Sequence, residues 1–297
     1  MTVVVVGDIV TDVLAVTAGP VATGSDTAAS ITIGGGGSAA NTAAWLAHLG
    51  LPVTLVGAVG LDEAGTSRLA ELAAAGVRCA VRRTADAATG AVVVLSGDGE
   101  RSMLADRGAN GHLRPADVLP LLPGAAHLHL SGYTLFDPAT AEAGRAALDT
   151  ARVEGATTSV DAASVAPLRL VGGATFLSWV RGADLLIANE PEARALLDGA
   201  DGDAGELARR LTGWAIRVVV KRGADGSVWA DRDGRLVPAP AQPATVVDVT
   251  GAGDAFAAGL LAAWLGGATP GGALAAGARL GAEAVGVAGG RPPARRR

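Results

Sequence analysis

Short apolar runs alternate with alanine- and leucine-rich segments along most of this sequence, and this alternation restricts the fold more than any other feature. The runs have the composition of strands buried on both faces, and strands are expected at Val3–Val6, Val53–Val56, Ala126–Leu130, Thr158–Val160, Leu185–Ala188 and Val218–Val220. Helical spacing predicts helices over Ser38–Leu49, Ala64–Ala75, Pro138–Val153, Glu190–Leu197, Gly205–Leu211, Asp254–Leu265 and Pro270–Val287. The alternation therefore predicts an α/β fold with a mostly parallel central sheet and helices on both faces.

Two regions interrupt the alternation, at about 13–33 and 90–110. Each carries paired β-like runs joined by turn residues and has no helix of its own, so neither region is a βαβ unit. Such runs suit a small β-sheet that stands over one edge of the main sheet. Because no fixed-period repeat and no low-complexity linker occurs, we expect residues 1–297 to form a single domain with this small sheet as its lid.

Composition argues against several classes of protein. Although 49% of the residues are hydrophobic, no stretch of about 18 apolar residues lacks a charge or a Gly/Pro break, which argues against a transmembrane helix. The opening MTVVVVGDIVTDV favours a buried strand over a signal peptide. A net charge of −5 offers no basic field for nucleic acid, and a lone cysteine, Cys79, fits a reducing compartment. We therefore expect a cytoplasmic protein with neither nucleic acid nor membrane as a partner, and a frayed, solvated tail at 291–297.

The stretch Asp248–Gly259, DVTGAGDAFAAG, places small residues where an apolar run gives way to a helix. The backbone N–H groups of Gly251, Ala252 and Gly253 could converge there on an oxyanion, aided by the helix dipole. Asp254 beside such a hole would repel a phosphate unless a proton-bearing group lay between them, and a substrate hydroxyl is such a group. From the spacing alone, a simple N-cap role for Asp254 stays open.

A second glycine-rich stretch, GGGGSAANTAAWLAHLG at Gly34–Gly50, leads into the first expected helix. Its glycines indicate a hinge or a close approach of the backbone to a ligand, and Asn41 can offer an amide from the first turn. A tight strand-to-helix turn would explain the glycines as well. Neither G-x-x-x-x-G-K-[ST] nor G-x-G-x-x-G after the first strand is present, so no common nucleotide-binding motif is indicated.

Taken together, the two stretches make the chain resemble the ribokinase-like (phosphofructokinase-B) family of sugar and nucleoside kinases, from Val3 to Gly290. Gly36–Gly50 looks like the first signature of that family and Asp248–Gly259 like the second. The resemblance implies an ATP- and Mg²⁺-dependent kinase that phosphorylates a primary hydroxyl of a furanose-type sugar. The alternative is a kinase of purine, pyrimidine or C-linked nucleosides. A non-catalytic nucleotide- or sugar-binding regulator would be expected to lose the base or the glycines, and an oxidoreductase would need a fingerprint that is absent.

The resemblance also gives roles to individual residues. Asp254 matches the catalytic base, and Gly251, Ala252 and Gly253 match the anion hole. The substrate-binding candidates are Asp12, Gly36, Gly37 and Asn41, to which Arg107 and Asn110 near the lid are added. The nucleotide-binding candidates are Asn189, Glu192, Lys221, Gly223 and Gly226. For metals, Glu192 matches a residue near Mg²⁺, and Asp248 matches a position associated in many members with a monovalent cation, usually potassium.

Several of these residues have a plainer interpretation. Arg107 would serve equally as a salt-bridge partner under the lid, and Glu192 as a solvated glutamate in a first helical turn. Lys221, the only lysine, could contact a nucleotide phosphate or merely cap a strand edge. His127 and His129 alternate on one strand and are expected to be packed or hydrogen-bonded, not metal ligands. Exposed edges of the lid strands favour a homodimer.

Overall fold

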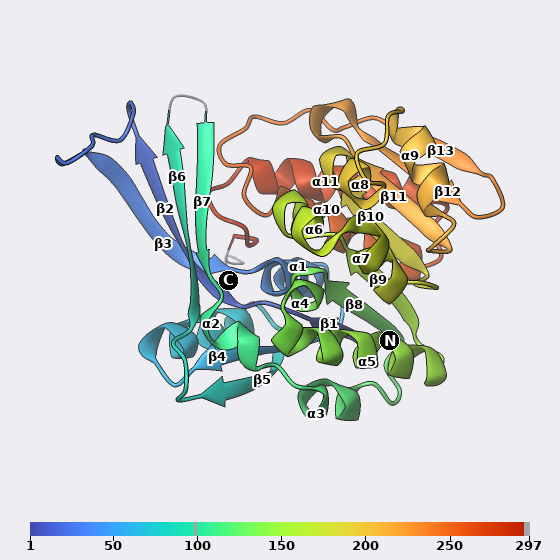
Figure 1. The fold of residues 1–297 in the computed structure, drawn as a ribbon, viewed down its shortest axis with the longest axis horizontal. Coiled ribbons are helices and arrows are strands. Elements are labelled where there is room, and N and C mark those ends of the chain that lie inside the picture. Colours follow the sequence, from blue (N-terminus) through green and yellow to red (C-terminus); the bar gives the residue numbers. More distant parts are fainter. Residues whose placement is uncertain (98–99, 294–297) are drawn as a thin grey trace.

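Residues 1–97 and 100–293 are described by a computed structural model, in which two β-sheets organise the chain (Figure 1). The larger sheet has nine strands in the order β13-β12-β11-β10-β9-β8-β1-β4-β5. Its strands are β1 (Val3–Val6), β4 (Val53–Gly60), β5 (Arg78–Thr84), β8 (His127–Ser131), β9 (Thr157–Asp161), β10 (Leu185–Asn189), β11 (Arg217–Lys221), β12 (Ser227–Asp231) and β13 (Leu236–Ala239). The run from β5 to β11 is parallel, and β12 and β13 add an antiparallel edge.

Successive residues of the central strand β1 face opposite sides of the sheet and enter two different cores. Val4 and Val6 belong to the core covered by α5 (Pro138–Val153), α6 (Val165–Val171), α7 (Gly173–Trp179), α8 (Glu190–Leu196) and α9 (Ala204–Leu211). Val3 and Val5 belong to the core covered by α1 (Ser38–His48), α2 (Glu63–Ala74), α10 (Ala252–Leu265) and α11 (Pro270–Val285). The predicted mostly parallel sheet with helices on both faces is therefore confirmed.

The smaller sheet is the predicted lid. It has the order β3-β2-β6-β7 and consists of β2 (Val10–Thr17), β3 (Ala29–Gly36), β6 (Gly90–Gly97) and β7 (Glu100–Asp106). In Figure 1 these strands stand beside α10 and α11 and above β4, with the C-terminal segment at their foot. The strands begin a few residues earlier than the expected region because Val10–Asp12 already pair with Gly34–Gly36.

The structure adds elements that the apolar runs do not indicate. Strand β5 lies at the edge of the sheet, and each of its residues before Thr84 is at least partly exposed, so the strand tolerates Arg78, Arg82 and Arg83. The β12–β13 pair and the short helices α6 and α7 lack a distinct period. Short elements α3 (Pro115–Val118), α4 (Tyr133–Phe136), η1 (Gly108–His112), η2 (Leu119–Leu121) and η3 (Gly223–Asp225) complete the chain.

The two histidines of β8 are packed and hydrogen-bonded, as expected. His127 contacts the hydroxyls of Thr157 and Ser159 at 2.9 and 2.8 Å, and His129 contacts Ser159 at 2.8 Å. Burial lowers the pKa of His127 to about 3 and that of His129 to about 4, so both rings are neutral at physiological pH. In the described ranges, no helix has both the length and the apolarity needed to cross a bilayer.

Candidate active site

Helix α10 begins at the small-residue turn, immediately after Gly251. Gly251 has φ +71°, and a Cβ there would lie 2.4 Å from the Cα of Gly290, so glycine is required both for the conformation and for the close approach. The N–H of Ala252 donates to the carbonyl of Val249 at 3.3 Å, which differs from its predicted place in an anion hole. The N–H groups of Gly251 and Gly253, with the helix dipole, are the better candidates.

Asp254 lies in the first turn of α10, and its carboxylate reaches across to helix α1. Oδ1 accepts a hydrogen bond from Ser38 Oγ at 2.8 Å, and Oδ2 accepts one from Asn41 Nδ2 at 2.9 Å. The N-cap interpretation of Asp254 is therefore wrong, because Gly251 occupies that position. Burial raises the pKa of Asp254 to about 7, since the charged form is poorly solvated despite its two donors. A carboxylate with this pKa can accept a proton near neutral pH.

Helix α1 holds Ser38 and Asn41 in place through its own N-terminus. Asp8, which follows β1, accepts a hydrogen bond from the backbone N–H of Ser38 at 3.0 Å. Asn41 is 3% exposed, and within the described residues its buried Oδ1 has no hydrogen-bond partner. A buried amide oxygen without a partner is costly, so this atom suits a hydroxyl donor brought by a ligand.

The glycines before α1 bring the lid against the candidate base. A Cβ at Gly36 would lie 2.2 Å from the carboxylate of Asp12, and one at Gly37, where φ is +98°, would lie 2.4 Å from the carbonyl of Asp8. Asp12 on β2 thus lies directly against the turn that leads to Asn41. The predicted substrate-side residues Asp12, Gly36, Gly37 and Asn41 are brought together.

On the other side of Gly253 lies a buried ammonium group. Lys221, at the carboxyl end of β11, pairs with Asp161 at the end of β9, with Nζ 3.0 Å from Oδ2. A Cβ at Gly253 would lie 3.2 Å from the same Nζ. Because β11 lies between β10 and β12, the alternative that Lys221 caps a strand edge is wrong. Burial lowers the pKa of Lys221, but Asp161 and Glu192 outweigh it and hold the pKa above its ordinary value, so the group stays charged.

Sequence reasoning missed Asp161, although it follows the predicted strand Thr158–Val160. Asp161 is 5% exposed, and its carboxylate accepts a hydrogen bond from the N–H of Ala163 at 2.9 Å and faces Lys221. The signal available was an acidic residue at the carboxyl end of a buried parallel strand, which is where ligands bind in such sheets.

Asn189 and Glu192 form a reciprocal capping box at the start of α8. The two oxygens of Glu192 accept from the backbone N–H and the Nδ2 of Asn189 at 2.8 and 2.7 Å, and Asn189 Oδ1 accepts from the N–H of Glu192. The solvated interpretation of Glu192 is wrong, because it is 4% exposed and burial raises its pKa. With both oxygens engaged, Glu192 fits Mg²⁺ through water better than by direct contact.

The remaining nucleotide and cation candidates shape backbone turns. Gly223 and Gly226 have φ of +58° and +90° in the turn between β11 and β12. Asp248 links two segments: Oδ1 accepts from the N–H and hydroxyl of Thr250, and Oδ2 accepts from the N–H of Gly289 at 2.9 Å. These hydrogen bonds would orient nearby backbone carbonyl groups, whose oxygens are typical ligands of a potassium ion. Within the described ranges, no group of three or more His, Cys, Asp or Glu could hold a metal ion.

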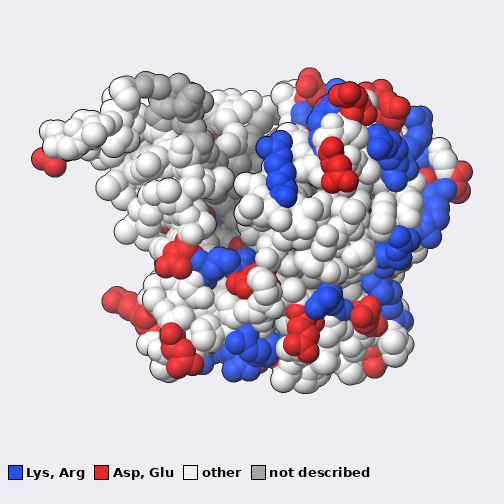
Figure 2. All heavy atoms as spheres, in the orientation of Figure 1, with Lys and Arg blue, Asp and Glu red and all other residues white. Residues whose placement is uncertain are grey.

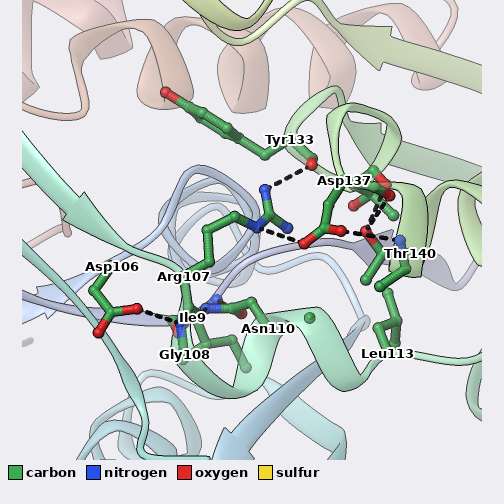
Figure 3. Close-up of polar contacts among 12 residues, drawn as sticks. Ile9, Asp106, Arg107, Gly108, Asn110, Leu113, Tyr133, Asp137 and Thr140 are labelled. Atoms are coloured by element: carbon green, nitrogen blue, oxygen red, sulfur yellow. Dashed lines mark hydrogen bonds and ion pairs between the residues drawn. The ribbon is translucent and has the colours of Figure 1, made fainter.

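The two candidates under the lid are engaged in anchoring contacts (Figure 3). Arg107 donates to the carbonyl of Tyr133 at 2.8 Å and pairs with Asp137 at 3.4 Å, in line with its salt-bridge interpretation. The amide of Asn110 bonds both the N–H and the carbonyl of Ile9, at 2.9 and 3.0 Å. These contacts fix the loop after β1, and a direct role of either side chain in substrate binding stays a prediction.

The sequence suggested a solvated C-terminal segment, but part of this segment is buried. Residues 294–297 lie outside the described residues, but Arg291 is folded inward and its side chain is 13% exposed. Just before it, the carbonyl of Gly290 accepts from Trp45 Nε1 at 3.0 Å. The segment borders a cavity of about 850 Å³ under the lid, lined also by Asp12, Gly35 and Thr250.

A mostly parallel α/β sheet with a small β lid, and a buried carboxylate at the start of a helix that begins in a glycine turn, fits an enzyme that transfers a phosphoryl group to an alcohol. Residues 1–296 match the model of the family described as pfkB family carbohydrate kinase, so the chain belongs to that family. It is an ATP-dependent phosphotransferase that acts on a sugar or a nucleoside.

Named relatives agree with this class. The chain is 36% identical over 235 residues to an ATP-dependent ribose-1-phosphate kinase of Halopiger xanaduensis, covering 78% of this chain and 73% of that protein. It is 30% identical over 236 residues to a ribokinase of Schizosaccharomyces pombe, covering 75% and 71%. Among solved structures, an adenosine kinase from Sinorhizobium meliloti superposes with a TM-score of 0.87 at 26% identity, covering 98% of this chain and 95% of that one.

Proposed function

We propose that the chain transfers the γ-phosphoryl group of ATP to a primary hydroxyl of a furanose-type sugar, with Asp254 as the general base. The observation that carries this proposal is the position of Asp254. Its carboxylate is held by Ser38 and Asn41, and Asp254 directly follows Gly253, the last residue of the candidate anion-binding turn. A hydroxyl between the two would lose its proton to Asp254 as the phosphoryl group arrives.

On the acceptor side, Asp12 and Asn41 would hold the hydroxyls of the sugar. The unpartnered Oδ1 of Asn41 accepts one, and the carboxylate of Asp12 suits vicinal hydroxyls. Because Asn41 Nδ2 also holds Asp254, substrate binding and the orientation of the base are linked through one amide. Closure of the lid would exclude water and thereby limit hydrolysis of ATP.

On the donor side, Gly251, Gly253 and Lys221 would hold the terminal phosphates. The position of Lys221 Nζ beside Gly253 supports this, because it adds a full charge to the partial charges of the turn. We propose that Mg²⁺, which neutralises phosphate charge when bound, lies near Glu192 and Asp161. We also propose a potassium ion beside Asp248 and the two segments that it links.

A nucleoside acceptor is the alternative. The cavity under the lid favours a sugar, because its described lining includes no Phe, Tyr or Trp on which a nucleobase would stack. Relatives named for ribose 1-phosphate and ribose support the same preference, whereas the adenosine kinase supports the alternative.

The test is a coupled assay of ADP release over free sugars, sugar phosphates and nucleosides, each with and without K⁺. We expect ADP formation with a furanose acceptor that carries a free primary hydroxyl, and phosphorus NMR should locate the new ester at that oxygen. Turnover restricted to nucleosides would select the alternative. Binding of ATP and sugar without any turnover would instead indicate a regulator.

We further propose a cytoplasmic homodimer of single-domain subunits that associate through the outer face of the lid. The strand register places one row of apolar side chains on the face of the lid opposite Asp12: Ile33, Val13, Val93 and Leu104. Ile33 is 65% exposed and Leu104 63% exposed, and the lid shows few charged residues in Figure 2. Sedimentation of the wild type and of an Ile33→Lys variant tests this, since only the variant should be monomeric.

A further inference from the structure

A guanidinium group occupies the acceptor end of the cavity under the lid. Arg291 donates through one terminal nitrogen to the carbonyl of Gly36 at 3.2 Å and pairs through the other with Glu71 at 3.0 Å. A Cβ at Gly35 would lie 2.0 Å from the guanidinium, so the missing side chain at Gly35 makes room for it. Arg291 therefore lies against Gly36, the same glycine that lies against Asp12.

The guanidinium of Arg291 shares its ion-pair partner, Glu71, with a second buried guanidinium, that of Arg68. Burial and the neighbouring Arg68 lower the pKa of Arg291 to about 10, although Glu71 and Asp12 oppose that effect. Its buried Nε has no hydrogen-bond partner in the part of the chain that the structure describes, and the same is true of the Nε of Arg68, which is 7% exposed. Two buried cations thus share Glu71, and each retains an unused donor.

We propose that Arg291, with Arg68 behind it, receives a phosphate group carried by the acceptor, so that the preferred acceptor is a furanose phosphate. This inference rests on the proposed function. A guanidinium fork matches phosphate oxygens in two-point geometry, and a phosphate supplies the acceptor that the buried Nε lacks.

The neighbouring acid Asp12 distinguishes a sugar phosphate from other anions. A bare anion beside Asp12 and Glu71 would be repelled, whereas a molecule that presents a hydroxyl to Asp12 and a phosphate to Arg291 contacts each group with its favourable partner. A free sugar has no phosphate for Arg291. Arg291 lies close to the candidate base Asp254. A Cβ at Gly290, the residue before Arg291, would lie 2.5 Å from Asn41 Nδ2, and this nitrogen donates to Asp254.

The experiment compares three pairs of acceptors in the ADP-release assay: ribose 1-phosphate with ribose, and fructose 1-phosphate and fructose 6-phosphate with fructose. The wild type should show a higher kcat/KM for the phosphate in at least one pair. Arg291→Gln should lower that value by about 10- to 100-fold, as expected for a lost charge-assisted contact, and leave the free sugar within about 2-fold. The matched control is Arg279→Gln, on the exposed side of α11, which should keep the preference.

The outcomes separate this inference from the function on which it rests. Equal losses for phosphate and free sugar in Arg291→Gln would show a structural role and overturn the inference, as would a wild type without preference in any pair. In both cases the kinase activity itself stands. Failure of all acceptors in this assay and in the wider panel would overturn the proposed function. If Arg291→Gln does not fold, Arg291→Lys, which keeps the charge but loses the fork, should show an intermediate preference.

Discussion

Replacing Asp254 by Asn should abolish most of the activity and, at the same time, stabilise the protein. The amide can keep both neighbours, because its oxygen accepts from Asn41 and its NH₂ donates to the Ser38 hydroxyl, which can reverse its role. What is lost is the proton acceptor, and we expect kcat to fall by about 10²- to 10⁴-fold.

The gain in stability follows from the raised pKa. The folded state moves the pKa of Asp254 from 3.8 to about 7, so the stabilising form is the protonated one, present below about pH 4 and lost as the pH rises toward 7. If the whole pKa shift acted on stability, ionisation of Asp254 would lower the free energy of unfolding of the wild type by about 4 kcal/mol above pH 7. The side chain keeps partial contact with solvent, which weakens this effect. We therefore expect Asp254→Asn to gain roughly half of that free energy, about 2 kcal/mol, which corresponds to about 4 °C in Tm.

The assay combines ADP release with thermal unfolding at pH 5 and pH 8. Asp254→Asn should melt above the wild type at pH 8, with a smaller difference at pH 5, where the wild-type carboxylate is largely protonated. The kcat/KM of the wild type should rise with pH through about 7, the pKa of its base. The control Asp149→Asn alters an exposed carboxylate on α5 and should change neither property. Near-wild-type turnover, or a lower Tm at pH 8, would refute the reasoning.

Three further predictions concern the donor side and the core. Lys221→Met should raise KM for ATP and lower kcat by about 10²-fold, since a buried charge beside Gly253 is lost; an unchanged KM for ATP in steady-state kinetics would contradict this. Asp161→Asn removes the charged partner that lies 3.0 Å from Lys221 and should lower kcat with little change in the KM of the acceptor. A change confined to the KM of the acceptor would place Asp161 on the acceptor side of the site. Phe176→Ala empties a fully buried site in the core under α7 and should lower the free energy of unfolding by about 3–5 kcal/mol in urea titrations, whereas a loss below about 1 kcal/mol would show loose packing there.

The sequence alone determined the main sheet, the lid and the two glycine-rich signatures. It could do so because buried parallel strands are continuous apolar runs and because turns with positive φ favour glycine, so each leaves a local trace. The same local reasoning failed for β5 and β13, which are the two edge strands of the sheet, and for β12, which pairs antiparallel with β13.

Only the tertiary structure decided which distant residues share the site. Asp254 meets Ser38 and Asn41 across more than 200 residues of sequence, and Asp161 meets Lys221 across 60. The same holds for Arg291, whose place beside Gly36 turns an expected solvated tail into part of the acceptor cavity. The physical reason is that a charge acts on whatever lies nearest in space. Its pKa and its free donors depend on burial and on neighbours that folding alone supplies.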